Sequence, residues 1–181
     1  MNQETLPRVI GIGGFKRSGK DTLARALRKL SGYDVIGMSD AIVAEVEQLT
    51  GWEITDEMKE QVIPGQPGVT YRDVLIQHGE RRRAMLPSYW TDEMAQQVHA
   101  SLLAGKGVIV AGLRMEEEFQ WIRRNGGRVI WLTRHGIVSN GHATEADQSH
   151  LCDLPVANDG DIEQVASKAF DGLAALSTHS H

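Results

Sequence analysis

Short apolar runs alternate with longer amphipathic stretches along the chain, and this alternation is typical of an α/β fold with a largely parallel sheet. The first apolar run, at 8–13, precedes Leu23, Leu27 and Leu30, whose spacing predicts a helix. The same pattern predicts strands over 8–13, 33–38, 107–111, 128–133 and 153–157, and helices over 19–31, 40–50, 70–85, 90–104, 115–125 and 161–176. We therefore expect a three-layer α/β/α fold with a mainly parallel sheet of about five strands.

Two segments of the chain match neither a strand nor a helix. Residues 51–69 hold a cluster of prolines and glycines at 64–68, which indicates an irregular excursion over the sheet. Residues 135–151 form a polar stretch between the last two expected strands, which indicates a mobile loop. We expect one domain over 1–181, with a helical region at 51–105 and a lid at 135–151.

The composition and charge of the chain limit where the protein acts and what it binds. A chain of 181 residues can bury a sizeable core, and its single cysteine, Cys152, excludes an intramolecular disulfide. The segment Met1 to Pro7 is polar, and no apolar run approaches the roughly 18 residues of a membrane span. The formal net charge of -5 offers no electrostatic argument for binding a nucleic-acid polymer or a membrane. We expect a cytoplasmic protein that acts on small molecules.

The segment GGFKRSGKDT, at 13–22, joins the first expected strand to the first expected helix. Gly14, Gly19 and Lys20 match a phosphate-binding pattern in which backbone N–H groups wrap the phosphates and the lysine reaches the transferred group. The positive end of the helix adds to the same site. A chance glycine turn is the alternative, but the flanking strand and helix favour phosphate binding. The expected ATP-binding residues are Gly14, Phe15, Lys16, Arg17, Ser18, Gly19, Lys20, Asp21 and Thr22.

One position in this loop departs from the pattern. The pattern has a serine or threonine after the lysine as a magnesium ligand, whereas this chain has Asp21 followed by Thr22. Asp21 could supply a carboxylate to magnesium directly or through water, because magnesium prefers hard oxygen ligands. Alternatively, its charge only favours the first turn of the helix. Both interpretations stay open.

Further polar side chains follow the expected strands, at the edge of an open α/β sheet where ligands bind. Asp40, Arg114 and Arg134 lie within three residues after the ends of three expected strands, 33–38, 107–111 and 128–133. A guanidinium that leaves a buried strand is costly without an anion, so Arg114 is a candidate for binding phosphate. Its alternative is an ion pair with a glutamate at 116–118. Asp40 has two interpretations as well, a bond to a sugar hydroxyl or a cap on the following helix.

The order of these motifs resembles the phage-type deoxynucleoside monophosphate kinases over most of the chain. The segments that carry the resemblance are GFKRSGKDT, Ser39-Asp40-Ala41, Arg72 with Gln77-His78-Gly79 and Trp90, Leu113-Arg114 with Glu118, Gly126 to Ile130 and on to Arg134, His142-Ala143-Thr144-Glu145, and Val156 to Gly160. Animal-type phosphomevalonate kinases share a similar loop and are a close alternative. The family usually carries an acid two residues before the strand-end arginine, where this chain has Gly112.

The resemblance implies phosphorylation of a deoxynucleoside monophosphate with ATP and Mg²⁺. The expected catalytic residues are Lys20, Arg17, Arg114 and Arg134, and Asp21 is the candidate metal ligand. The expected acceptor-binding residues are Asp40, Arg72, Gln77, Arg83 and Trp90. Arg83 is included because Arg72, Gln77 and Arg83 recur about every turn and a half of a helix and some could face one cleft, although a run of arginines is usually a solvated face. The helical region at 51–105 would then bind the acceptor. Gly112 and Asp21 also support a different alternative, a catalytically weak ATP-binding module. We expect small-molecule nucleotides as partners, a homodimer as a possible assembly, and the host cytoplasm if a phage encodes the chain.

Overall fold

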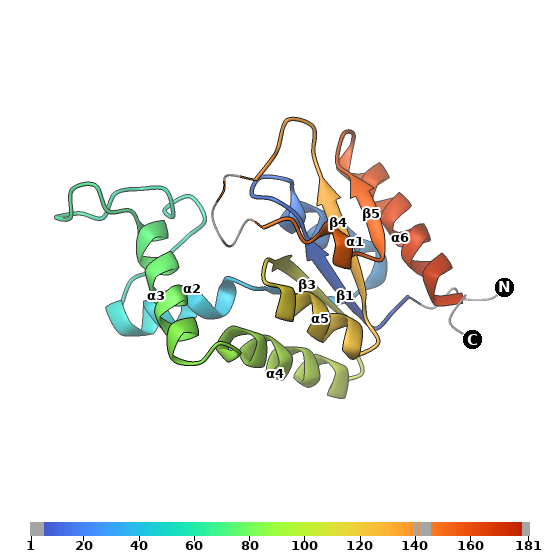
Figure 1. Cartoon of the computed structure of the whole chain (residues 1–181), viewed down its shortest axis with the longest axis horizontal. Helices are drawn as coiled ribbons and strands as arrows, with labels where there is room; N and C mark the ends of the chain where they lie inside the picture. The colour runs from blue at the N-terminus through green and yellow to red at the C-terminus, as the bar shows by residue number, and fades with distance from the viewer. Residues whose placement is uncertain (1–5, 140, 142–145, 179–181) are drawn as a thin grey trace. The chain divides into compact units, whose positions relative to one another are not determined.

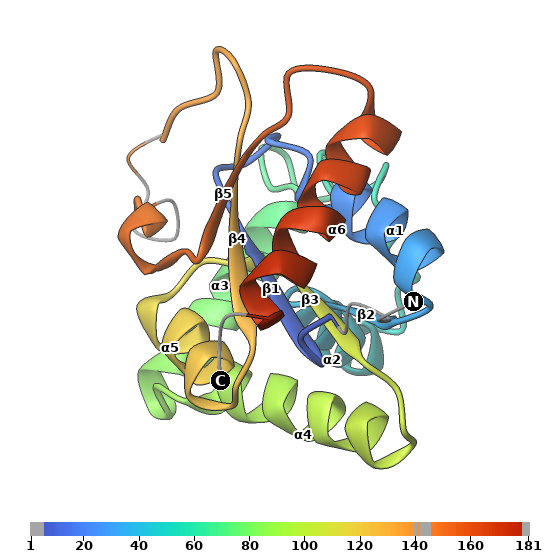
Figure 2. The same cartoon turned by 90° about the vertical axis from the view of Figure 1, so that its right-hand side faces the viewer.

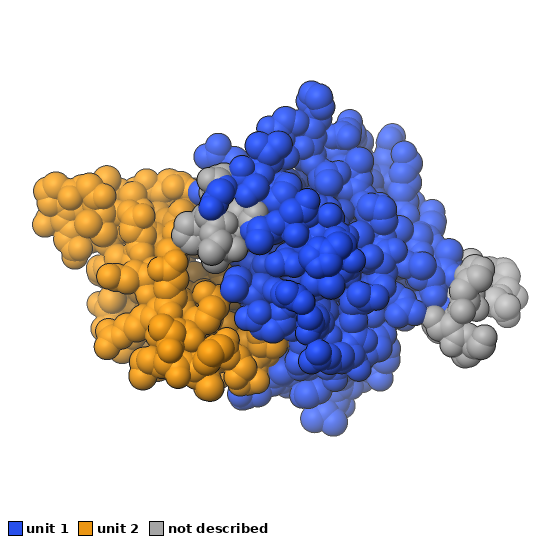
Figure 3. All heavy atoms as spheres, viewed as in Figure 1, with its two compact units in different colours: residues 1–37, 95–181 blue, residues 38–94 orange. Residues whose placement is uncertain are grey.

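The computed structural model describes residues 6–139, 141 and 146–178. The chain divides into two compact units, which Figure 3 shows in different colours. Unit 1 comprises Met1–Gly37 and Ala95–His181, and unit 2 comprises Met38–Met94. None of the helices in the described ranges is long and apolar enough to span a membrane.

Unit 1 is built on a five-stranded sheet in the order β2-β3-β1-β4-β5, in which every neighbouring pair is parallel. The strands are β1 (Val9–Gly13), β2 (Asp34–Gly37), β3 (Val108–Leu113), β4 (Arg128–Thr133) and β5 (Leu154–Ala157). Its helices are α1 (Lys20–Ser31), α5 (Glu116–Arg124), α6 (Ile162–Thr178), the short 3₁₀ turn η2 (Ser149–Leu151) and the second half of α4 (Tyr89–Leu103). The expected strands, helices and three-layer architecture are confirmed, with small shifts at the element ends.

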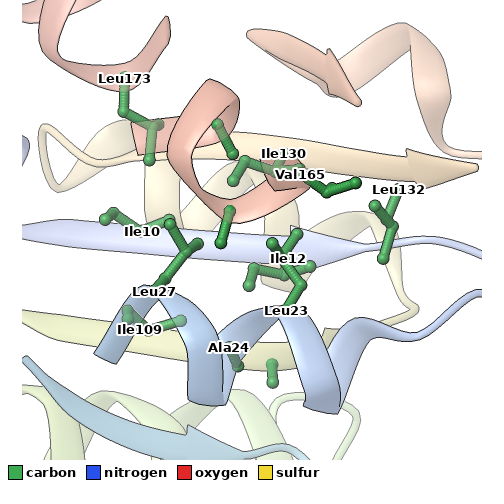
Figure 4. Close-up of a cluster of buried hydrophobic side chains, with 13 residues drawn as sticks. Ile10, Ile12, Leu23, Ala24, Leu27, Ile109, Ile130, Leu132, Val165 and Leu173 are labelled. Atoms are coloured by element: carbon green, nitrogen blue, oxygen red, sulfur yellow. The ribbon is translucent and has the colours of Figure 1, made fainter. Parts of the chain in front are cut away.

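Successive side chains of a strand point to opposite faces of the sheet, and helices cover both faces. Ile10 and Ile12 of β1 point to the face that α1 and α6 cover, where they meet Leu23 and Leu27 of α1 (Figure 4). The other face of the sheet carries α5 (Figures 1 and 2). Both faces of β1 and β3 are therefore buried, which is why these strands read as nearly continuous apolar runs.

Unit 2 consists of α2 (Asp40–Thr50), α3 (Tyr71–Met85) and the start of α4, joined by an irregular segment at 51–70. The segment contains turns and one isolated bridge between Val62 and Thr70, so it forms neither a helix nor a strand, as expected. The small core of unit 2 contains the buried residues Val46, Ile54, Ile63, Tyr71 and Leu75.

A capping box begins α3. Thr70 Oγ1 accepts a hydrogen bond from the backbone N–H of Asp73 at 3.1 Å, and Asp73 Oδ2 accepts one from the backbone N–H of Thr70 at 2.8 Å. These two bonds satisfy donors that a helix start leaves unpaired. They fix where the irregular segment ends and the helix begins.

Candidate functional site

The loop at 14–19 leaves the sheet at its topological switch point. β1 is the central strand of the sheet. β2 and β3 lie on one side of it, and β4 and β5 lie on the other side. Ligands bind outside the carboxyl ends of the strands at such a point. Arg114 and Arg134 follow β3 and β4, so they leave the sheet on either side of the loop.

The loop encloses the side chain of Lys20. Lys20 Nζ donates hydrogen bonds to the carbonyl oxygens of Gly14 and Phe15, both at 2.7 Å, and the residue is only 8% exposed. Ser18 N–H donates to Phe15 O at 3.1 Å and closes a turn within the loop. A buried ammonium at the start of a helix attracts anions, so the loop fits the phosphates of a nucleotide.

Ser18 adds a second indication of a ligand. The residue is 1% exposed, and its Oγ is buried with no hydrogen-bond partner in the described part of the chain. Buried hydroxyl groups nearly always have a partner, so an unpaired one beside a buried cation fits a loop that binds a polar group.

Arg17 adopts a strained backbone conformation at the tip of the loop. Its φ of 67° lies in the left-handed region, which non-glycine residues rarely adopt. Its side chain is exposed. Backbone strain of this kind is concentrated at ligand-binding sites, where surrounding contacts hold it.

Asn158 links the loop to the end of β5. Its Nδ2 donates a hydrogen bond to the backbone carbonyl of Ser18 at 2.8 Å, and its own backbone N–H donates to Thr133 O at 2.8 Å. Gly19 has a φ of 99° and precedes the first residue of α1. A Cβ at Gly19 would overlap Asn158 Nδ2, so the glycine is required both by its φ and by this close approach.

The side chain of Glu118 forms hydrogen bonds with the backbone at Arg114. The glutamate is 3% exposed, and its Oε2 accepts hydrogen bonds from the backbone N–H groups of Arg114 at 2.7 Å and Met115 at 3.1 Å. This arrangement caps α5 and fixes the peptide that carries Arg114. Of the three glutamates named as alternatives, Glu118 is therefore the one that contacts the Arg114 backbone.

Gly112 forms a bulge at the end of β3. Ile12 pairs with Ala111 and Gly13 pairs with Leu113, so Gly112 is the extra residue in the ladder. Its φ is 88°, which residues with a Cβ rarely adopt. Bulges often lie beside active sites, where they redirect the chain, and this one lies two residues before Arg114.

A cavity of about 520 Å³ adjoins the loop and the first turn of α1. Its lining residues are Gly19, Thr22, Arg134, His135, Asn158, Asp159, Gly160 and Ile162. Asp159 Oδ1 accepts a hydrogen bond from the backbone N–H of His135 at 2.9 Å, which ties the loop after β4 to the loop after β5. This volume lies within the range of ligand pockets, and the cavity adjoins the phosphate-binding loop at Gly19.

Asp21 offers one carboxylate near the loop for a bound metal ion. Asp21 is exposed in the first turn of α1. The described residues contain no group of three or more His, Cys, Asp or Glu side chains that could hold a metal. Magnesium usually keeps several waters and binds through one or two carboxylates and the substrate phosphates, so these residues fit a metal that arrives with the nucleotide.

The expected acceptor residues all belong to unit 2. Asp40 is the exposed first residue of α2, while Gln77 is exposed and Arg83 half-buried on α3. Arg72 Nε donates to Glu60 Oε1 at 2.7 Å, an ion pair within unit 2. Trp90 is 3% exposed and its Nε1–H donates to Gly79 O at 2.9 Å, so its ring packs in the interior of the unit instead of presenting a face to solvent.

A charged network that the sequence analysis missed joins the helices of unit 2. Glu45 Oε2 lies 2.7 Å from His78 Nε2 and accepts a bond from Arg82 Nε at 2.9 Å, and Glu45 Oε1 accepts one from the Tyr89 hydroxyl. The Arg82 guanidinium also lies over the Tyr89 ring, 5.0 Å from its centroid. Burial opposes ionisation of Glu45, but hydrogen bonds from Tyr89, His78 and Arg82 outweigh it and lower the pKa of Glu45.

The contacts of Asn158 and Asp159 were not predicted from the sequence. Both stand in the segment that carried the family resemblance, and polar residues directly after a strand of the sheet were the available signal. The expected lid at 135–151 includes His142 to Glu145, which lie outside the described residues. The described residues 146–151 end in η2, which precedes β5.

Comparisons with known proteins agree with this fold. A gluconokinase from Sinorhizobium meliloti 1021 is 16% identical, with 97% of this chain and 99% of that chain covered and a TM-score of 0.52. A shikimate kinase from Aquifex aeolicus vf5 is 13% identical, with 93% and 98% covered and a TM-score of 0.54. A dephospho-CoA kinase from Campylobacter jejuni is 13% identical, with 94% and 98% covered and a TM-score of 0.50.

At these identities the likeness concerns the fold, which is the three-layer α/β/α fold of P-loop kinases. No protein-family model matches the chain, and no curated protein sequence matches it either.

Proposed function

We propose that the chain catalyses ATP-dependent phosphorylation of a nucleoside monophosphate, preferably a deoxynucleoside monophosphate, to the diphosphate. The strongest support is the buried Lys20 ammonium inside a glycine loop at the switch point of the sheet. The strands on either side of this loop lead directly to Arg114 and Arg134. Binding of ATP alone does not require two further arginines at this edge, whereas phosphoryl transfer uses positioned cations to offset charge on the transferred group.

The residues of unit 1 neutralise and orient phosphate groups. We assign Lys20, Arg17, Arg114 and Arg134 to phosphates, and the loop backbone from Phe15 to Asp21 to the β-phosphate of the donor. Bound ATP would supply the γ-phosphoryl group, and Asp21 would help to hold a Mg²⁺ ion that offsets charge on the phosphates. Because phosphoryl transfer proceeds through a loose transition state, positioned cations and backbone donors supply most of the catalysis.

A monophosphate acceptor fits the absence of an assigned general base. A phosphate monoester has a second pKa of about 6, so at pH 7 the attacking oxygen is already mostly deprotonated. An alcohol acceptor would need a group to accept its proton. We assign Asp40, Arg72, Gln77 and Arg83 of unit 2 to the acceptor.

Phosphomevalonate and an alcohol are the two alternative acceptors. Phosphomevalonate is also a phosphate acceptor, but it has no base or ribose for the protein to recognise. The fold likeness to a gluconokinase and a shikimate kinase makes an alcohol acceptor the second candidate. In that case Asp40, the exposed first residue of α2, is the candidate general base.

The deciding experiment measures phosphorylated product from a panel of acceptors with ATP and Mg²⁺. The panel contains dAMP, dGMP, dCMP, dTMP, their ribose counterparts, phosphomevalonate, gluconate and shikimate. We expect diphosphate product from one or more nucleotides, with the deoxyribose form preferred. Turnover of phosphomevalonate or of an alcohol alone would refute the nucleotide assignment. ATP binding without product from any acceptor would support the weak ATP-binding module.

Lys20→Met tests whether Lys20 contributes to catalysis at this site. Removal of one preorganised hydrogen-bond donor that stabilises negative charge in the transition state typically lowers kcat by about a hundredfold or more. We expect that loss with a circular dichroism spectrum like that of the native chain. Near-normal turnover in the folded variant would remove Lys20 from the phosphate site.

A further inference from the structure

Asn158 reaches the phosphate-binding loop from a distant part of the chain. It follows β5, and its backbone N–H bonds to Thr133 O at 2.8 Å, so the sheet sets its position. Its side-chain Nδ2 donates to Ser18 O at 2.8 Å, a contact between residues 140 positions apart. Asn158 therefore connects the end of β5 to the Ser18–Gly19 peptide of the loop.

That hydrogen bond determines which way the Ser18–Gly19 peptide faces. In a planar trans peptide, the C=O and N–H groups point in opposite directions. Because Asn158 holds the Ser18 carbonyl toward itself, the Gly19 N–H must point away from Asn158. Phosphate loops work through N–H groups turned toward the anion, so a reversed peptide would present a carbonyl oxygen to the phosphate.

Gly19 fits the same arrangement. Its φ of 99° is available to glycine at little cost, and its missing side chain leaves the space that the Asn158 carboxamide occupies. Glycine, however, also permits the peptide to rotate more freely than other residues do. A hydrogen bond from outside the loop is a way to hold that peptide in one orientation.

We propose that Asn158 is a positioning residue that orients the Ser18–Gly19 peptide for binding the donor phosphates. This inference rests on the proposed function, in which the loop binds the phosphates of a nucleotide. Asn158 also lines the cavity beside the loop, so direct contact with the nucleoside part of the ligand is the competing explanation. The two explanations differ in which part of the ligand is affected by a substitution.

The test compares ATP with inorganic tripolyphosphate, which has the phosphates but no base or sugar. Asn158→Asp keeps the size of the side chain but turns a carboxylate oxygen against the Ser18 carbonyl, which favours reversal of the peptide. Isothermal titration calorimetry in the presence of Mg²⁺ gives the Kd of each ligand. We expect both Kd values to rise by a similar factor of about tenfold or more, the effect of losing one good hydrogen bond at the site.

Asn125→Asp is the control, because Asn125 Nδ2 also donates to a backbone carbonyl, that of Trp121 at 2.9 Å, but Asn125 precedes β4 and so lies at the opposite end of that strand from Arg134. It should leave the tripolyphosphate Kd unchanged. Asn158→Ala is the second variant, because it removes the same hydrogen bond without adding a negative charge that would itself repel both ligands. It should raise both Kd values in the same direction. A purely structural role would lower Tm but leave the Kd values of the folded variant unchanged.

The outcomes separate the inference from the proposed function. A weaker ATP affinity with unchanged tripolyphosphate affinity would show contact with the nucleoside part and overturn the positioning role. Unchanged affinities for both ligands would overturn it as well. If the native chain binds neither ATP nor tripolyphosphate, the proposed function itself fails, whatever the variants do.

Discussion

Gly19→Ala tests the close contact between the start of α1 and the end of β5. The substitution adds a Cβ at a residue whose φ is 99° and whose side-chain space Asn158 Nδ2 already occupies. The backbone must then hold an alanine in a sparsely populated conformation, and the Asn158 carboxamide must move away from Ser18 O. Each of these two effects carries its own energetic cost.

The expected loss of stability is the sum of the two costs. A non-glycine residue in such a backbone conformation costs about 1 to 3 kcal/mol. Loss of the Asn158 hydrogen bond adds about 0.5 to 1.5 kcal/mol. We therefore expect Gly19→Ala to lower the free energy of unfolding by about 1.5 to 4.5 kcal/mol.

Urea unfolding of four proteins measures the two parts separately. The native chain, Gly19→Ala, Asn158→Ala and the double variant form a cycle whose coupling energy reports the clash. In the Asn158→Ala background the carboxamide is already gone, so Gly19→Ala should cost about 1 kcal/mol less than in the native chain. An equal cost in both backgrounds would refute the clash.

Gly32→Ala supplies a matched comparison at the other end of α1. Gly32 also has a left-handed backbone, with a φ of 72°, but no atom lies within 4 Å of its would-be Cβ. Its substitution should therefore cost only the backbone term, about 1 to 2 kcal/mol. A loss at Gly32 as large as that at Gly19 would mean that backbone strain alone explains both.

Three further predictions concern other parts of the molecule. Arg114→Ala and Arg134→Ala should each lower kcat/KM by about tenfold to a hundredfold, the effect of losing a charge-assisted bond to phosphate, with little change in Tm. A large fall in Tm that nucleotide cannot restore would instead make Arg114 a structural residue. Asp21→Ala should raise the Mg²⁺ concentration for half-maximal rate, and an unchanged titration would leave only its role at the helix start. Glu45→Gln should lower Tm more at pH 7 than at pH 3.5, because a depressed carboxyl pKa stabilises the fold above the unfolded value of about 4.3 and this contribution disappears as pH falls through the folded pKa.

The elements and the loop were predictable because they depend on residues that are close in the sequence. The apolar run before Gly14 and the leucine spacing after Lys20 define a strand, a turn and a helix without any tertiary information. In a parallel sheet the carboxyl ends of all strands share one edge, so Arg114 and Arg134 could be assigned to that edge from their positions alone.

The contacts that shape the site depend on partners distant in the sequence, and these could not be predicted. The bond from Asn158 to Ser18 requires the strand order, which places β5 beside β4. The fate of Trp90 depends on how α3 and the start of α4 pack, and its indole N–H bonds to Gly79 inside unit 2. A pattern of aromatic residues does not distinguish a ring in the core from a ring against a ligand.

Gly112 shows why a departure from a family pattern can have a backbone cause. The resemblance leads one to expect an acid at this position, two residues before Arg114. In the structure the position is the extra residue of a bulge with a φ of 88°, and a side chain there would be strained. Restoring the acid would therefore do more than add a carboxylate, because it would also disturb the bulge that directs the chain toward Arg114. An assignment of magnesium to Asp21 is consistent with this constraint, since Asp21 lies in an ordinary helical turn where a carboxylate is well tolerated.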